Sequence, residues 1–170
     1  MAVLPLIVAP DPRLKQPSEH VSEVNEEIRQ LVNDMIETMY QKDGIGLAAV
    51  QIGVHKKVVV IDVEWGTKDK NPIVMINPEI IEFSEEKTAL NEGCMSFPNQ
   101  YPSVIRPSTV TVKYKDLEWQ EHIIQAEGLF AKCIQHEIDH TNGITFVDHI
   151  PQLKRKIILD KLLRLKINKA

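Results

Sequence analysis

A helical pattern near the C-terminal end contains a set of polar residues, His136-Glu137-Ile138-Asp139-His140. Residues four apart lie on the same face of an α-helix, because one turn takes 3.6 residues. His136 and His140 therefore share a face, with Glu137 beside them. Two imidazoles and a carboxylate in a His-Glu-x-x-His pattern are typical of a hydrolytic metal site. A polar helix face that carries two histidines by chance is the plainer alternative.

A catalytic metal usually takes three protein ligands and keeps one position for water, so two histidines are not sufficient. Downstream, Gly143 fits the metzincin spacing, but position 146 is a phenylalanine where that pattern needs a histidine. A thermolysin-like glutamate is also excluded, because no residue after Asp160 is acidic. His149 lies beyond a chain turn and stays open as a weaker candidate for the third ligand.

Two cysteines are the upstream candidates for that ligand. Cys133 lies one turn before His136 on the same helix, so it cannot easily converge on a metal between the two histidines. We expect it to be a small buried side chain. Cys94 lies in a separate loop, Glu92-Gly93-Cys94-Met95-Ser96. A thiolate from this loop would complete a Cys-His-His site with one open position.

The segment Gly44-Ile45-Gly46-Leu47-Ala48-Ala49-Val50-Gln51 contains small residues that let another backbone approach closely, and it ends in a side-chain amide. Its Gly-x-Gly-x-x-Ala spacing also matches the dinucleotide-binding fingerprint. That fingerprint requires a strand before it and a helix after it. Here an apolar helix pattern precedes the segment and a strand pattern follows, so we reject the nucleotide interpretation.

Hydrophobic periodicity predicts the secondary structure. We expect a helix between Ser22 and Asp43 with its apolar stripe at 28–40, and further helices at 127–141 and 151–167. Strands are expected at 58–63, at 73–81 with a break at Asn77-Pro78, and at 88–90, 108–115 and 122–126. Ser22 is the expected N-cap of the first helix, Gly143 the stop of the second, and Asp148 or His149 the cap of the third. Strands joined mostly by turns, with helices at both ends, indicate an α+β fold. Antiparallel sheets would pack around a central metal-motif helix, with an amphipathic N-terminal helix and a C-terminal helix.

The composition is that of one soluble domain spanning residues 1–170, with 43% hydrophobic and 26% charged residues. Two cysteines are too few for a disulfide framework. The chain has no signal-peptide pattern and no run of about 20 apolar residues, so we expect a cytoplasmic protein without membrane contact. A reducing compartment would leave both thiols free to bind metal.

The formal net charge of −4 is unevenly distributed. Residues 151–170 contain seven basic residues and one acid, a local charge of +6, so the remaining 150 residues carry −10. The main body is therefore not expected to bind DNA. The last helix, in contrast, has the charge to contact an anionic surface.

Three blocks of the sequence, 44–51, 92–96 and 135–140, resemble the three motifs of the peptide deformylases in order and spacing. The resemblance covers essentially the whole chain, and the C-terminal helix is similar to that of the bacterial type 1 enzymes. It implies a monomeric hydrolase that removes the N-formyl group from the starting methionine of new proteins and releases formate. Its partners would be N-formylmethionyl peptides and nascent chains. Because nascent chains emerge from the ribosome, the charge of the C-terminal helix adds the hypothesis of a ribosome contact through that helix.

The resemblance also implies roles for individual residues. The metal ligands would be Cys94, His136 and His140, and the metal would activate a water for attack on the formyl carbonyl. Glu137 would act as general base and acid, while the Gln51 amide and the Met95 backbone N–H stabilise the oxyanion. Substrate contacts would come from Ile45, Gly46, Leu90, Leu129 and Cys133. Glu92 and Arg106 match a pair that braces the cysteine loop.

The residues taken alone allow plainer roles for several of these positions. Gln51 would only hydrogen-bond its own loop, Leu90, Leu129 and Cys133 would be core residues, and Glu92 with Arg106 would form an ordinary salt bridge. Two alternatives for the whole protein also stand beside the hydrolase. A generic metalloprotease leaves the cysteine and the glycine-rich segment unexplained. A non-catalytic binding protein would use the basic last helix to dock on a large anionic partner.

A Cys-His-His ligand set suits zinc, and ferrous iron accepts the same set. The resemblance implies one Fe²⁺ per chain, with Zn²⁺, Ni²⁺ or Co²⁺ as substitutes. Four positions depart from common family residues: Val50, Met95, Tyr101 and Lys132. Tyr101 stands where some relatives carry an arginine that meets the substrate peptide, and Lys132 stands at a rim position that is often apolar. These departures leave the preference for residues after the methionine open.

Overall fold

The computed structural model describes residues 2–64, 66 and 69–168. A five-stranded antiparallel sheet has the order β1-β2-β3-β6-β7, and β4 and β5 form a second, two-stranded sheet. The strands are β1 Gly46–Ala48, β2 Val58–Ile61, β3 Ile73–Phe83, β4 Lys87–Asn91, β5 Ser103–Pro107, β6 Thr109–Lys115 and β7 Glu121–Glu127. The helices are α1 Glu26–Gln41, α2 Gly128–Thr141 and α3 Gln152–Asn168, with 3-10 segments η1 Pro12–Lys15, η2 Ala49–Ile52 and η3 Phe146–His149.

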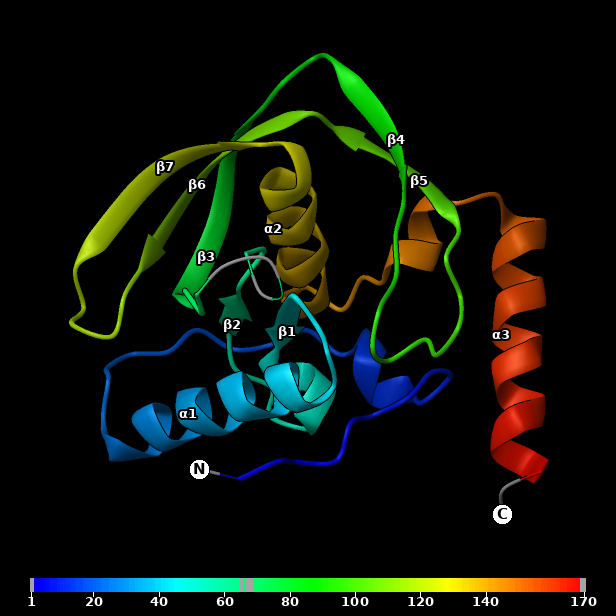
Figure 1. Cartoon of the computed structure of the whole chain (residues 1–170), viewed down its shortest axis with the longest axis horizontal. Coiled ribbons are helices and arrows are strands. Elements are labelled where there is room, and N and C mark those ends of the chain that lie inside the picture. Colours follow the sequence, from blue (N-terminus) through cyan, green and yellow to red (C-terminus); the bar gives the residue numbers. More distant parts are fainter. Residues whose placement is uncertain (1, 65, 67–68, 169–170) are drawn as a thin grey trace.

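The metal-motif helix α2 lies in the middle of the molecule, between the sheets (Figure 1). Helix α1 covers one side, and α3 stands at the end of the molecule away from the β6–β7 hairpin. The predicted α+β fold, with antiparallel sheets around a central helix and a further helix at each end, is confirmed.

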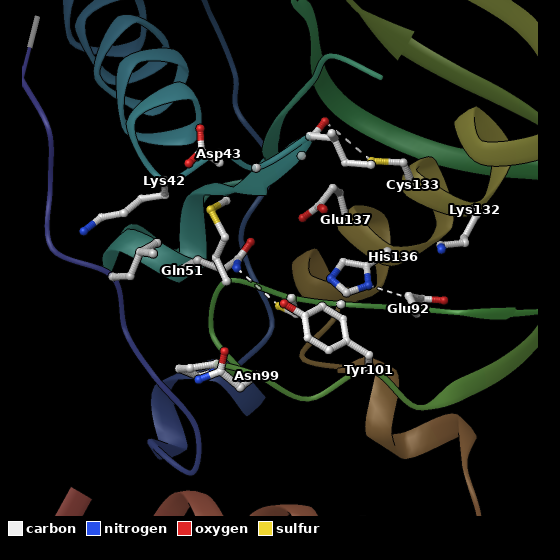
Figure 2. A pocket seen from close by; sticks show the side chains of 18 residues that line it. Lys42, Asp43, Gln51, Glu92, Asn99, Tyr101, Lys132, Cys133, His136 and Glu137 are labelled. Atoms are coloured by element: carbon white, nitrogen blue, oxygen red, sulfur yellow. Dashed lines mark hydrogen bonds and ion pairs between the residues drawn. The ribbon is translucent and has the colours of Figure 1, made fainter. Parts of the chain in front are cut away.

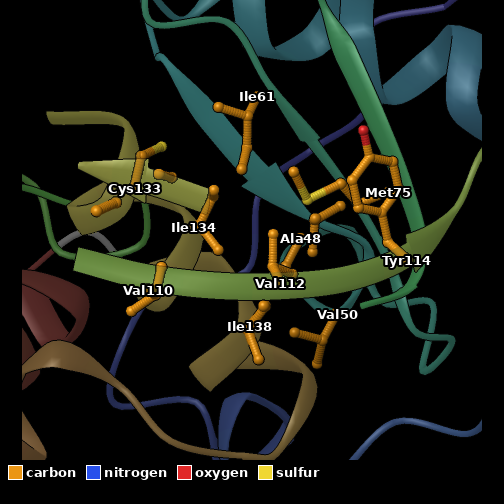
Figure 3. Packing of buried hydrophobic residues seen from close by; sticks show 13 residues of the cluster. Ala48, Val50, Ile61, Met75, Val110, Val112, Tyr114, Cys133, Ile134 and Ile138 are labelled. Carbon is orange, nitrogen blue, oxygen red and sulfur yellow. The ribbon is translucent and has the colours of Figure 1, made fainter. Parts of the chain in front are cut away.

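Helix α2 has an apolar face that packs against the sheet and a separate set of polar residues. Ile134 and Ile138 pack against the five-stranded sheet, where they join a cluster that includes Ala48, Val59, Ile61, Met75, Val110 and Val112 (Figure 3). Burying each such aliphatic side chain contributes roughly 1.5–3 kcal/mol. Several polar residues of α2 are also buried, namely Gln135, His136, Glu137 and His140. The apolar face therefore fixes the helix, and the fixed helix sets the positions of its polar residues.

Helix α1 packs through its predicted apolar stripe, and Ile28, Val32, Met35 and Met39 are buried. Its start differs from the expectation. The side chain of Asn25 accepts a hydrogen bond from the Ile28 N–H at 3.0 Å, which satisfies one of the free donors of the first turn. The predicted N-cap at Ser22 is therefore wrong, and the helix begins at Glu26.

Two strands were not predicted, and both have a weak pattern. β1 has only three residues, Gly46–Ala48, and two of them are small. β5 buries Val104 and Arg106 on one face, and a buried arginine does not register as an apolar position. The predicted break at Asn77-Pro78 is instead an irregularity inside a continuous β3, because the register against β6 shifts between Ile76 and Glu79.

Helix α3 is where it was predicted, but it packs against the protein through few of its apolar residues. Only Ile158 and Leu162 are buried, whereas Leu153, Ile157 and Leu165 are exposed. Asp148 does not serve as its cap, because its carboxylate accepts from the Thr145 N–H at 2.9 Å within η3. Across the described ranges, none of the helices is both long and apolar enough to cross a membrane.

The irregularity in β3 is stabilised by the side chain of Asn77. This residue has a φ of 52°, a left-handed conformation that asparagine tolerates better than most residues. Its amide donates to the Val21 carbonyl at 2.8 Å and accepts from the Val21 N–H at 2.8 Å. One side chain therefore ties β3 to the segment that precedes α1.

We predict that Asn77→Ala lowers the free energy of unfolding by about 2–4 kcal/mol, from two lost hydrogen bonds and an unfavourable φ. Asn77→Gly removes the same hydrogen bonds but accepts the positive φ, so it should be about 1 kcal/mol more stable than the alanine variant. Urea unfolding of the three proteins measures both differences. Wild-type stability in the alanine variant would show that Asn77 does not hold this segment.

Candidate metal centre

A cavity of about 480 Å³ brings the three sequence blocks together. It opens between β1, the loop that follows β4, and α2 (Figure 2). Gly44, Ile45 and Gly46, at the start of β1, form one wall, the Cys94 loop forms another, and α2 closes the inner end. The predicted site residues in its lining are Ile45, Gly46, Gln51, Glu92, Cys94, Met95, Cys133, His136 and Glu137.

Cys94 and His136 line this cavity, and they form a cluster with His140, which is fully buried and does not line it. One potential ligand atom from each residue lies within 4.8 Å of the others, and Cys94 Sγ is 3.4 Å from His140 Nε2. It is the only such group of three found among the described residues. The two other residues considered as ligands point elsewhere. Cys133 Sγ lies 3.7 Å from the Ile45 carbonyl oxygen, and His149 Nε2 lies 2.8 Å from Asp139 Oδ2.

The charges around the cluster fit a metal ion. Burial holds the pKa of His140 well below its usual value, so its imidazole is neutral, the form that binds metals. Burial also opposes a charge on His136, but the Glu137 carboxylate and the Cys94 thiolate together raise the pKa of that ring. The site therefore favours a positive charge, which a divalent cation would supply. Glu137 Oε1 is buried and has no hydrogen-bond partner in the described part of the chain.

The orientation of His136 is set by Glu92. His136 Nδ1 donates to Glu92 Oε1 at 2.6 Å, which leaves Nε2 free to bind a metal. Arg106 holds the same carboxylate through Nε at 2.9 Å and Nη2 at 2.7 Å. Burial alone would raise the pKa of Glu92, but the hydrogen bonds from His136 and Arg106 lower it to about 2. Glu92 is therefore ionised, and its contact with a candidate ligand makes this more than an isolated salt bridge.

Glu137 has the properties of a residue that exchanges protons. Burial is the main cause that raises the pKa of its carboxyl group to about 7, and a group that titrates near neutral pH can both accept and release a proton. The backbone of β1 lies directly against it. A Cβ at Gly46 would stand 2.6 Å from Glu137 Oε2 and 2.8 Å from Cys133 Sγ. Glycine is required here because any side chain would displace the carboxylate.

Gln51 is buried and makes contacts on both sides of its amide. Its Oε1 accepts from the Ala48 N–H at 3.0 Å, and its Nε2 donates to Ser96 Oγ at 3.1 Å. The same Nε2 lies 3.6 Å from Cys94 Sγ. The amide therefore braces its loop and also borders the cluster. Ser96, which orients it, was not singled out from the sequence, although it stands two residues after the cysteine.

The predicted substrate contacts divide into two groups. Ile45, Gly46 and Cys133 line the cavity. Leu90 and Leu129 do not line it; their exposed fractions are 41% and 45%. Leu90 instead borders a separate hollow of about 80 Å³.

The rim of the cavity carries polar side chains. Lys132 donates from Nζ to the Asn91 carbonyl at 2.6 Å, and Tyr101 is 68% exposed. Lys42, Asp43 and Asn99 also line the cavity (Figure 2). Sequence reasoning did not select these three, because nothing in their local pattern distinguishes them from ordinary loop residues.

The sequence and the structure of this chain are similar to those of known proteins. Residues 3–156 match the model of the polypeptide deformylase family. The peptide deformylase of Rhizobium meliloti (strain 1021) is 49% identical over 159 residues, which cover 94% of this chain and 91% of that protein.

Solved structures agree with this match. The crystal structure of peptide deformylase from Ehrlichia chaffeensis has a TM-score of 0.90 and 41% identity and covers 97% of both chains. A second structure from the same organism, in complex with actinonin, has a TM-score of 0.90 and 42% identity and covers 96% of this chain and 98% of that chain. The chain therefore belongs to the peptide deformylase family.

Proposed function

We propose that this protein removes the N-formyl group from the N-terminal formyl-methionine of newly synthesised proteins and releases formate. The observation that supports this function most directly is the convergence of Cys94, His136 and His140, next to a cavity that Cys94, His136 and the buried Glu137 line. We further propose that residues 1–170 act as a single catalytic domain.

The residues that would hold the metal are Cys94, His136 and His140. When bound, the metal supplies Lewis acidity, which lowers the pKa of a water molecule and polarises the formyl carbonyl. We assign the movement of the proton to Glu137. It accepts the proton of the attacking water and then gives it to the leaving amine, which must be protonated to depart. A pKa of about 7 suits both steps at neutral pH.

We assign the stabilisation of the developing oxyanion to the Gln51 amide and the Met95 backbone N–H. Loss of one such donor typically costs about 10²–10³ in rate. Ser96 and Ala48 hold the Gln51 amide before substrate arrives, so no binding energy is needed to orient it.

The substrate peptide is proposed to bind as an additional strand at β1. This strand is at the edge of the five-stranded sheet, where Gly46 borders the cavity. Peptides bind such edges through main-chain hydrogen bonds, and pockets for alternate side chains give specificity. We assign Ile45 and Cys133 to the wall that the methionine side chain contacts. Leu90 and Leu129 are not supported as contacts by the cavity lining.

The function is tested by formate release from a formyl-methionyl peptide. We predict that wild-type protein releases formate and that Glu137→Gln lowers the rate about 10²–10⁴-fold, because the amide cannot accept the proton. The variant should still bind one metal ion per chain, since Glu137 is not an assigned ligand. Full activity in Glu137→Gln would refute the assigned proton carrier. A wild-type protein that releases no formate but cleaves internal peptide bonds would revive the metalloprotease alternative.

We propose Fe²⁺ as the working metal, with Zn²⁺, Ni²⁺ or Co²⁺ as substitutes. A Cys-His-His set accepts each of these ions, and a thiolate neighbour leaves ferrous iron sensitive to oxygen. We predict that anaerobically prepared Fe²⁺ protein has a higher rate per bound metal than Zn²⁺ protein, and that it loses activity in air. Reconstitution of the metal-free protein with each ion, with metal content measured in every sample, checks this. The highest rate with Zn²⁺ would overturn the choice of iron.

We also propose that α3 contacts the ribosome, and that the protein acts as a monomer in the cytoplasm without binding DNA. Lys154, Lys161 and Arg164 are exposed on this helix, and so are the apolar residues Leu153 and Ile157. Exposed basic and apolar side chains together suit a large anionic surface with a protein component. Lys169, which belongs to the basic set in the sequence, lies outside the described residues.

The ribosome proposal predicts that reversing three charges, Lys154→Glu, Lys161→Glu and Arg164→Glu, reduces co-sedimentation with ribosomes at low salt. Formate release from a short peptide should not change. Lys113→Glu, in β6 at the other end of the molecule, is the matched control, since the Lys113 side chain is 46% exposed. Unchanged co-sedimentation of the triple variant would contradict the proposed ribosome contact.

A further inference from the structure

A chain of hydrogen-bonded side chains leads from the metal cluster to the surface. His136 Nδ1 contacts Glu92 Oε1 at 2.6 Å, and Arg106 binds both oxygens of Glu92. Arg106 Nη1 donates to Asp139 Oδ2 at 2.9 Å, and His149 Nε2 contacts the same oxygen at 2.8 Å. His149, which the sequence left open as a metal ligand, is therefore the outer end of a path that begins at a ligand.

The outer part of this path borders a second cavity. This cavity, of about 520 Å³, is lined by Arg106, Asp139 and His149, none of which lines the cavity of the metal cluster. Side-chain exposure falls along the path, from 37% for His149 to 20% for Asp139, 7% for Arg106 and 2% for Glu92. The inner contacts are thus shielded from water, where hydrogen bonds between charged groups are stronger.

Asp139 limits the movement of the arginine. A guanidinium group presents its donors in one rigid plane. Two of the Arg106 nitrogens bind Glu92, and a third is held by Asp139 from the other side. With Asp139 in place the guanidinium plane is fixed from both sides. His149 holds the shared Asp139 oxygen and so restricts the rotamer of that carboxylate.

We propose that Asp139 and His149 are positioning residues of the metal centre, which hold Arg106 so that Glu92 keeps His136 oriented toward Cys94 and His140. The proposal rests on the proposed metal centre. Partners behind metal-binding histidines typically change metal affinity by about 10–100-fold when they are removed. A purely structural pair would instead only tie η3 to α2, with no effect on the metal beyond general destabilisation.

The test is the dissociation constant for Zn²⁺ alone, measured by competition with a chromogenic chelator. We expect Asp139→Asn to weaken Zn²⁺ binding about tenfold, at the lower end of that range. His149→Ala should weaken it in the same direction by a smaller factor. His149→Gln keeps an N–H donor for Asp139 and should restore part of the affinity.

A double-mutant cycle separates positioning from structure. Glu92→Ala removes the acceptor of His136 and of Arg106, so His149→Ala should cause no further loss of Zn²⁺ affinity in that background. His122→Ala is the matched control. Its Nε2 contacts Asp116 Oδ2 at 2.7 Å, with side-chain exposures of 41% and 32%, but the pair belongs to the β6–β7 hairpin. That variant should bind Zn²⁺ like the wild type.

Two results would overturn the proposal: wild-type Zn²⁺ affinity in both His149→Ala and Asp139→Asn, or an equal loss for His149→Ala with and without Glu92→Ala. Urea unfolding of the metal-free proteins, measured in parallel, identifies variants that lose affinity only because they unfold. Failure of the wild type to bind stoichiometric Zn²⁺ is a different outcome, because it would contradict the metal centre itself.

Discussion

The buried carboxylate of Glu92 is the interaction on which the rest of the site depends. An unpaired charge in a protein interior costs several kcal/mol, so it persists only with close partners. Glu92 has two, Arg106 on one side and His136 on the other. These contacts join the loop after β4, strand β5 and helix α2. Because Cys94 is two residues further along the same loop, the ion pair that stabilises Glu92 also brings the thiolate to the two histidines.

The apolar packing explains why this polar arrangement can be buried. Ile134 and Ile138 hold α2 against the five-stranded sheet, and the same helix then presents His136 and Glu137 to the cavity. Gly46 lets β1 pass against the Glu137 carboxylate. Burial leaves one oxygen of that carboxylate without a partner among the described residues and raises its pKa to about 7. Unfavourable burial of this kind is typical of functional sites, where it adjusts a group to its chemistry.

Some of this structure could be predicted from the sequence for physical reasons. The stripe of α1 and the histidine pair of α2 follow from helical periodicity, which is local. The absence of a histidine at position 146 directed attention to Cys94, and the structure brings that residue to the cluster. β1 and β5 were missed, because one is very short and the other carries a buried arginine whose burial depends on Glu92.

Other features depend on contacts between distant segments. Asn25 rather than Ser22 caps α1, and the segment before the helix is held by Asn77 in β3, which contacts Val21, 56 positions earlier in the sequence. The hydrogen bond of Ser96 to Gln51 and the path from Asp139 to His149 have no local pattern either. Leu90 and Leu129 were assigned to the substrate by resemblance alone. In the structure both side chains are exposed, one on β4 and the other at the start of α2.

The central claim is that a loop cysteine and two helix histidines form one metal centre. X-ray absorption spectroscopy of the Zn²⁺-loaded protein tests it most directly, because sulfur and nitrogen neighbours scatter differently. We expect one sulfur at about 2.3 Å and two imidazole nitrogens at about 2.0–2.1 Å from the metal. The sulfur contribution should disappear in Cys94→Ser. A wild-type spectrum without sulfur, or a Cys94→Ser spectrum that keeps it, would contradict this metal centre.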